Sequence, residues 1–186
     1  MRLSTTHGLH RCPVPASECA LSVYSRRMHL YVFRHAIAED AEIGQADAQR
    51  RLTRDGTKKL KRVVKGLRAL DVHFERLLTS PWLRARETAK KLEALCDEAA
   101  VATDLLTQSP RAELLATIAE QGRDTGVVGH EPWLGELVAW LAFGDTRHSD
   151  ALVMKKAGVV WLEGSAVPGG MQLRAMLPPA FTGAAR

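Results

Sequence analysis

The stretch HLYVFR, residues 29–34, decides how this chain of 186 residues is interpreted. It is a short run of apolar and aromatic residues, which indicates a buried β-strand. The strand ends in Arg34, and His35 follows it directly. Polar residues at the end of a buried strand are expected to reach the edge of a sheet, where functional side chains often gather.

Downstream of this strand, helix and strand patterns alternate as far as residue 177. Thr53 is placed to cap a helix whose apolar residues recur at three- and four-residue spacing as far as Leu70. Ser109 is expected to cap another helix, which has Pro110 in its first turn and runs to about Gln121. Two more helices are expected at about residues 82–95 and from about Pro132 to Leu141. Further strands are expected at residues 76–79, 125–128, 158–163 and 171–177.

This order predicts an α/β fold, a three-layer α/β/α sandwich around a mainly parallel sheet with an antiparallel edge. We expect one domain over residues 28–178, followed by a short tail at residues 179–186. Residues 1–27 are expected to be a disordered N-terminal extension, which an upstream start ahead of Met28 would explain. The extension contains two histidines and a cysteine, but without a second cluster they do not predict a metal site; they are His7, His10 and Cys12.

The composition is that of an ordinary globular protein, with 46% apolar and 25% charged residues. No apolar run is long enough to cross a bilayer, so no membrane association is expected. Residues 1–27 hold four arginines and one glutamate, so only +2 of the net charge of +5 belongs to the remainder. Nucleic-acid binding therefore gains little support. Two of the three cysteines also lie in residues 1–27, and we expect a monomer in the reducing cytoplasm.

Three of the expected strands end in unusual polar residues. Arg34 and His35 end the first, Ser80 follows the second with Arg84 just beyond it, and His130 follows the third. Ligands of open α/β sheets bind beyond the carboxyl ends of the strands. If these strands are neighbours, two histidines and two arginines meet in one crevice.

Such a cluster suits the chemistry of phosphoryl transfer. Two guanidinium groups offer planar, paired donors to a dianionic phosphoryl group. His130 is expected to open a helix, whose N–H groups and dipole favour the same anion. His35 is the candidate nucleophile, because neutral imidazole attacks phosphorus and positive surroundings lower its pKa. Arg34, Arg84 and His130 would then stabilise the charge of the transition state.

Four segments in series resemble the histidine phosphatase superfamily, and most of all its SixA-type branch of phosphohistidine phosphatases. They are LYVFRHAIAED (Leu30–Asp40), RRLTRDG (Arg50–Gly56), LLTSPWLRARETAKKL (Leu77–Leu92) and VVGHEPWL (Val127–Leu134). The resemblance implies that His35 is the transiently phosphorylated nucleophile. It also implies that Arg34, Arg84 and His130 bind the phosphoryl group, and that hydrolysis needs no metal ion or other cofactor.

The sequence departs from the family pattern at two points. Ala36 stands where the superfamily usually has the glycine of Arg-His-Gly, and we expect its one methyl group to be tolerated. Larger relatives also carry a glutamate, between the second arginine and the second histidine, that protonates the leaving oxygen. Glu113 falls in that interval and is the candidate general acid, although its surroundings do not match the motif.

The missing acid motif bears on the substrate. Imidazole leaves a phosphoramidate far more readily than an alkoxide leaves a phosphate ester, so it needs less help from an acid. The short links between the elements also leave little room for a cap, which suits a protruding protein side chain. We therefore expect a phosphohistidine phosphatase whose partner is a histidine-phosphorylated signalling or phosphotransfer protein.

Two alternatives remain open. The first is a phosphomonoesterase for a small metabolite, which a catalytic carboxylate at Glu113, Glu39 or Asp40 would favour. The second is a non-catalytic phosphate-binding module. Retention of both arginines and both histidines argues against the second, because binding alone does not require a nucleophile.

Overall fold

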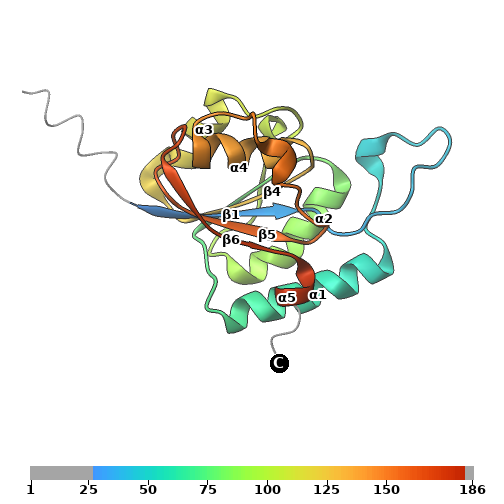
Figure 1. The fold of residues 1–186 in the computed structure, drawn as a ribbon. Coiled ribbons are helices and arrows are strands. Elements are labelled where there is room, and N and C mark those ends of the chain that lie inside the picture. The colour runs from blue at the N-terminus through green and yellow to red at the C-terminus, as the bar shows by residue number, and fades with distance from the viewer. Residues whose placement is uncertain (1–26, 183–186) are drawn as a thin grey trace, which may run out of the picture.

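A six-stranded sheet organises residues 27–182, the part of the chain that the computed structural model describes (Figure 1). The strands are β1 (Met28–Arg34), β2 (Arg76–Thr79), β3 (Val101–Ala102), β4 (Thr125–Gly129), β5 (Val159–Gly164) and β6 (Met171–Leu177). The α-helices are α1 (Arg54–Ala69), α2 (Leu83–Leu92), α3 (Ala112–Ala119), α4 (Trp133–Phe143) and α5 (Pro179–Thr182). Short 3-10 turns lie at residues 47–49, 93–95, 104–106, 120–122 and 149–151.

The strand order is β3-β2-β4-β1-β5-β6. The first four strands pair in parallel, β5 pairs antiparallel with β1, and β6 pairs antiparallel with β5. The predicted α/β fold, with a mainly parallel sheet and an antiparallel edge, is therefore confirmed. The order also makes β2, β4 and β1 direct neighbours, as the predicted crevice requires.

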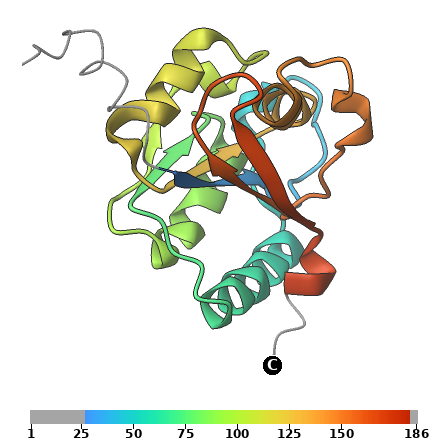
Figure 2. The same cartoon turned by 60° about the vertical axis from the view of Figure 1, so that its left-hand side comes forward.

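Alternation along β1 divides the core into two layers, because successive side chains of a strand point to opposite faces. Leu30 and Val32 join the apolar cluster that includes residues of α3 and α4. Tyr31 and Phe33 join the cluster that includes residues of α1 and α2. Figures 1 and 2 show helices on both sides of the sheet, which gives the predicted three-layer sandwich.

Helix α1 begins where its sequence predicts. The hydroxyl of Thr53 accepts a hydrogen bond of 2.9 Å from the backbone N–H of Gly56, which satisfies one of the free donors of the first turn. At the far end of α1, Gly66 lets the backbone of Thr182 approach closely. The segment expected to be a tail thus starts with a short helix, α5, that packs on α1 and buries Pro179 and Thr182.

Several boundaries differ from the expectations. Ser109 and Pro110 do not open α3, because its first acceptor is the carbonyl of Arg111, which receives the N–H of Leu114 at 2.9 Å. Burial of the apolar residues Leu114, Leu115 and Ile118 sets this register, and the proline signal is overridden. Helix α2 ends at Leu92 and continues as a 3-10 turn. The two-residue strand β3 was not predicted, since both its side chains are exposed.

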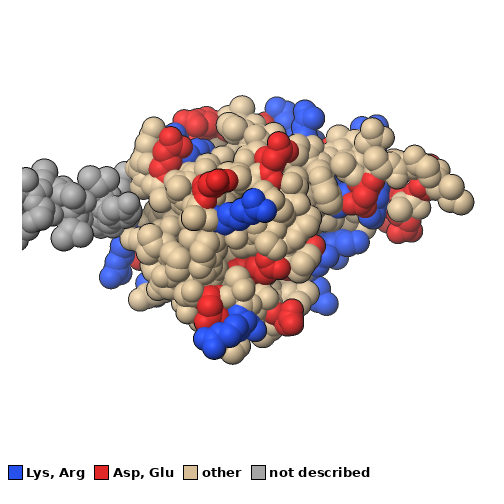
Figure 3. Space-filling model, turned by 90° about the horizontal axis from the view of Figure 1, so that it is seen from above, with Lys and Arg blue, Asp and Glu red and all other residues tan. Residues whose placement is uncertain are grey.

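No helix in residues 27–182 is long and apolar enough to span a membrane. On the face seen in Figure 3, positive and negative side chains are interspersed, so this face offers no continuous basic surface to a nucleic acid. The expected N-terminal extension, with its two histidines and its cysteine, lies outside the described residues.

Candidate active site

The neighbouring ends of β1, β4 and β2 bring the predicted residues together. Arg34 is in register with Gly129, and the N–H of His35 donates to the carbonyl of Gly129 at 3.1 Å. On the other side of β4, the N–H of Ser80 donates to the carbonyl of Val128 at 2.9 Å. The three chain segments therefore leave the sheet side by side, and the four predicted residues lie together at this edge.

His35 presents a neutral ring with a defined tautomer. Its Nδ1 lies 2.7 Å from the carbonyl oxygen of Ala36. A carbonyl can only accept, so this contact assigns the hydrogen to Nδ1 and the lone pair to Nε2. Burial is the main cause that lowers the pKa of His35 to about 4, with smaller contributions from the charges of Arg84, Arg34 and Lys156. Ala36 itself is fully buried among apolar side chains, so its methyl group fits.

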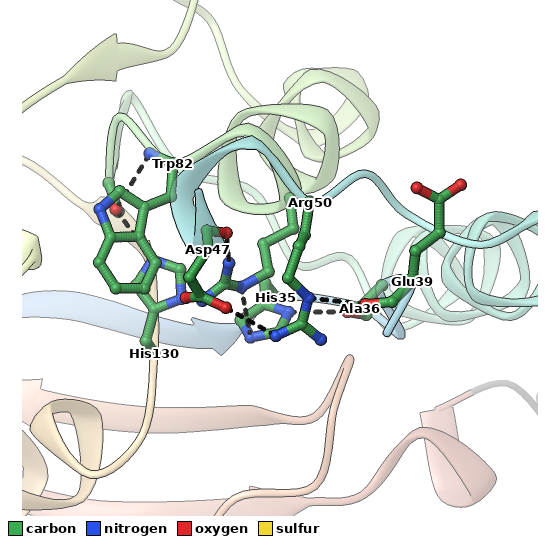
Figure 4. A network of polar contacts seen from close by, with 9 residues as sticks. His35, Ala36, Glu39, Asp47, Arg50, Trp82 and His130 are labelled. Carbon is green, nitrogen blue, oxygen red and sulfur yellow. Dashed lines mark hydrogen bonds and ion pairs between the residues drawn. The ribbon is translucent and has the colours of Figure 1, made fainter. Parts of the chain in front are cut away.

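Arg84 comes from the first turn of α2 and is only 5% exposed. Its guanidinium lies over the ring of Trp82, 4.5 Å from the ring centroid. Its Nε–H points to the Nε2 of His35 at 3.3 Å. The other two donors meet Asp47: Nη1 donates to the backbone carbonyl at 2.6 Å and Nη2 to the carboxylate at 2.8 Å. Figure 4 shows His35 and Asp47 in this network.

Arg34 is held from the opposite side of the crevice. Its Nη1 donates to the carbonyl of Met154 at 2.6 Å, while its buried Nε has no partner among the described residues. The loop that supplies this carbonyl is fixed by Glu131, whose carboxylate accepts the N–H of Met154 at 2.7 Å and that of Gly135 at 3.0 Å. Glu131 therefore links the start of α4 to the position of Arg34.

His130 stands beside His35, with the two ring centroids 5.0 Å apart. Its Nε2 lies 2.9 Å from the hydroxyl oxygen of Ser80, which also accepts the N–H of Trp82 at 3.3 Å. Because a hydroxyl group both donates and accepts, this contact fits either tautomer of the neutral His130 ring. The Nδ1 of His130 is buried without a partner among the described residues. Burial and then the charges of His35 and Arg84 lower the pKa of His130 to about 3.

The expected helix terminus at His130 needs correction. Helix α4 begins at Trp133, three residues later. The N–H of Leu134 donates to the carbonyl of His130, and that of Gly135 donates to the side chain of Glu131. These donors are already paired within the protein, so less of the helix terminus is available to an anion than the sequence suggested.

The candidate acid Glu113 is exposed in the first turn of α3. No hydrogen bond or ion pair joins its carboxylate to another residue of the described chain, and none brings it to the four-residue cluster. Glu39 and Asp40 are also exposed, and the carboxylate of Glu39 points away from His35 (Figure 4). The structure gives these three carboxylates no contact with His35.

Four residues at the crevice were not singled out from the sequence. Asp47 binds Arg84, Arg50 binds Asp47 at 2.7 Å, Glu131 positions the loop that holds Arg34, and Lys156 adds positive charge near His35. Arg50 and Glu131 lie inside segments that resemble the superfamily, which was the available signal. Asp47 and Lys156 lie in irregular segments, for which periodicity gives no placement.

Asp47 also corrects the expectation that the crevice has little cover. The segment between β1 and α1 leaves the body of the domain (Figure 1) and returns its 3-10 turn, Asp47–Gln49, to the crevice. Within residues 27–182, no group of three or more His, Cys, Asp or Glu residues is placed to hold a metal ion. The guanidinium groups of Arg34 and Arg84 are donors suited to an anion.

Comparison with known proteins supports the resemblance to the histidine phosphatase superfamily. Residues 30–107 match the family model described as histidine phosphatase superfamily (branch 1), a range that contains Arg34, His35 and Arg84. An uncharacterized protein from Picosynechococcus sp. is 42% identical over 148 residues, which cover 75% of this chain and 87% of that protein.

Two solved structures share the fold. The protein histidine phosphatase SixA, complexed with tungstate, is 25% identical, with a TM-score of 0.68 over 83% of this chain and 99% of that one. A phosphoserine phosphatase mutant from Entamoeba histolytica, in complex with phosphoserine, is 15% identical, with a TM-score of 0.61 over 82% of this chain and 98% of that one.

Proposed function

Because this chain belongs to the histidine phosphatase superfamily and has the architecture of its SixA-type members, we propose that it is a phosphohistidine phosphatase with a protein substrate. Phosphatase activity follows from the family. The choice of substrate and the role of each residue are the proposal, and they rest on the geometry of the crevice.

In the first step, the Nε2 of His35 attacks phosphorus and the P–N bond to the substrate imidazole breaks. The departing ring keeps the electron pair of that bond, and it leaves as neutral imidazole because its other nitrogen carries a hydrogen. Arg34, Arg84 and a ring N–H of His130 stabilise the charge on the phosphoryl oxygens. Arg84 points its Nε–H at His35, the His130 ring lies beside that of His35, and the charge of Arg34 acts on the His35 ring. The contact between Nδ1 of His35 and the carbonyl of Ala36 stabilises the positive ring that forms.

In the second step, a water oxygen attacks phosphorus and the P–N bond to His35 breaks. The ring keeps its hydrogen on Nδ1, so it leaves as neutral imidazole and no acid is needed to release it. Both hydrogens of the water remain on the orthophosphate product, which forms as H₂PO₄⁻. The enzyme thus returns to its starting protonation state.

The observation that carries the choice of substrate is that none of the described residues around His35 is a poised acid. Asp47 accepts hydrogen bonds from Arg50 and Arg84, the first of which is the main cause that lowers its pKa. Glu131 accepts two backbone N–H groups. His35 and His130 are neutral near pH 7, because their pKa values are about 4 and about 3. Such a site favours a substrate whose leaving group departs without a proton, as imidazole does.

A quench experiment tests the nucleophile. Enzyme stopped during turnover of a histidine-phosphorylated protein is analysed by mass spectrometry for a phosphate that is acid-labile and alkali-stable. We expect the phosphate on His35, none in His35→Ala, and an unchanged adduct in the control His73→Ala, which alters an exposed histidine paired with Asp97. An adduct that persists in His35→Ala would overturn the assignment.

A leaving-group series tests the missing acid. For aryl phosphates of graded leaving-group pKa, we expect kcat/KM to fall steeply as that pKa rises, and the phosphohistidine protein to be preferred over sugar phosphates. A flat dependence would reveal an acid that protonates the leaving group. A strong preference for an alkyl ester would instead favour the small-metabolite phosphatase. We also expect activity to persist after exhaustive treatment with EDTA.

A further inference from the structure

The guanidinium of Arg84 has a partner at each of its three nitrogens. Nε–H points to the lone pair of His35, and both terminal nitrogens donate to Asp47, one to its carbonyl and one to its carboxylate. A planar guanidinium binds a phosphoryl group through the same donors. The carboxylate of Asp47 therefore takes the place on Arg84 that a phosphoryl oxygen would need.

Asp47 is held at this place by a second arginine. Its Oδ1 accepts Nη1 of Arg50 at 2.7 Å, and Nε of Arg50 donates to the carbonyl of Glu39 at 2.7 Å across the loop. Figure 4 shows Arg50 between Asp47 and Glu39. Arg50, a residue of the same loop, therefore holds the Asp47 carboxylate in position.

The loop that carries Asp47, residues 39–50, is attached to the rest of the domain mainly where its two ends meet. Ala38 pairs with Leu52, and the N–H of Leu52 donates to the side chain of Glu87 on α2 at 2.7 Å. None of the residues from 39 to 50 is buried. The loop therefore lacks the apolar packing that would fix it over the crevice, and the polar contacts of Asp47 hold it there.

We propose that Asp47 is a specificity-determining residue that gates the phosphoryl site, and that only a dianionic group displaces it from Arg84. The proposal rests on the proposed function, because it takes Arg84 to be a phosphoryl ligand. Displacement lets the 39–50 loop move outward. A ligand with one negative charge interacts with Arg84 no more strongly than the Asp47 carboxylate does, so it does not displace that carboxylate.

The gate weakens apparent affinity for phosphate, because the ligand must first compete with Asp47. The Asp47 side chain is 49% exposed, so solvent screens its bond to Arg84 and a modest effect is expected. We expect Asp47→Asn and Asp47→Ala to bind inorganic phosphate about 5- to 10-fold more tightly than the wild type. For a monoanion such as formate, we expect detectable binding in the variants only.

Calorimetric titration with inorganic phosphate measures this directly and does not depend on turnover. The matched control is Asp145→Asn, which removes the same charge from another aspartate–arginine pair, with Arg147, beyond the far end of α4. Its phosphate affinity should equal that of the wild type. Equal or weaker binding in both Asp47 variants would overturn the gate, whereas absence of phosphate binding in every protein would overturn the phosphoryl site itself.

A second measurement separates a moving gate from simple charge repulsion. If phosphate displaces Asp47, backbone amides of the loop should exchange with deuterium faster in the wild type at saturating phosphate. The reporters are the amides of Gln45, Gln49 and Arg50, which are hydrogen-bonded within the loop. Unchanged exchange at these amides would show that the loop stays in place, and would overturn the gate even if the variants bind phosphate more tightly.

Discussion

Replacing Glu131 by glutamine should destabilise the domain and misplace Arg34 at the same time. Each oxygen of the Glu131 carboxylate accepts one backbone N–H, from Met154 at 2.7 Å and from Gly135 at 3.0 Å. Glutamine keeps one acceptor and turns an NH₂ group toward the other N–H. One charge-assisted bond is lost and two donors face each other, which together cost about 2 kcal/mol at this half-buried site. For a chain of this size, that lowers Tm by about 4–8 °C.

The activity of the same variant reports on Arg34. The carbonyl of Met154 holds Nη1 of Arg34 at 2.6 Å, so a looser loop loosens the arginine, and we expect kcat/KM to fall by about tenfold. Urea unfolding and steady-state kinetics on a phosphohistidine protein measure the two effects. The control is Glu136→Gln on α4, whose side chain makes no hydrogen bond or ion pair within residues 27–182. Full stability of Glu131→Gln would refute the anchoring role, and lowered stability with unchanged kcat/KM would refute the link to Arg34.

Three further predictions concern the nucleophile and its surroundings. Arg84→Ala should lower kcat by about 10²–10³-fold, since a charged donor is lost from the transition state; near wild-type turnover would contradict its role. The low pKa values of His35 and His130 mean that the unfolded chain binds more protons below about pH 6.5. The free energy of unfolding should therefore fall from about pH 6.5 to about 4, by up to about 1.4 kcal/mol per pH unit for each histidine; urea unfolding should show a weaker pH dependence in His35→Asn. Gly56→Ala should lower the free energy of unfolding by about 1–3 kcal/mol, because its methyl group would overlap the carbonyl of Ile37. An unchanged urea midpoint would show that the backbone at Ile37 moves aside without cost.

The sequence predicted the elements whose pattern is local. The buried run of β1 and the spacing of α1, with Thr53 as its cap, need only neighbouring residues to be recognised. The clustering of Arg34, His35 and His130 then followed from a topological rule, because parallel strands with short connections deliver their carboxyl ends to one edge. Local pattern and general topology were therefore sufficient for the core of the site.

The sequence did not predict the contacts that irregular segments make over long separations. Asp47 meets Arg84 across 37 positions of the chain, and its segment has no period that would place it. The same holds for Lys156, which lowers the pKa of His35 from a loop between α4 and β5. The predicted start of α3 was wrong for a related reason, since burial of the apolar side chains of that helix outweighed the Ser109-Pro110 signal.

Arg84 contacts both Asp47 and His35, and it therefore links the proposed gate to the proposed attack on phosphorus. The guanidinium that binds Asp47 also points its Nε–H at Nε2 of His35, the atom that attacks phosphorus in the proposed mechanism. A phosphoryl group that replaces Asp47 on Arg84 draws the guanidinium toward itself and away from that lone pair. One exchange of partners then frees the nucleophile and fills the anion site together. The proposed gate thus keeps the lone pair of His35 hydrogen-bonded to Arg84 until a dianionic group arrives. The charge of the phosphoryl group then selects the substrate, in addition to the leaving group that departs without a proton.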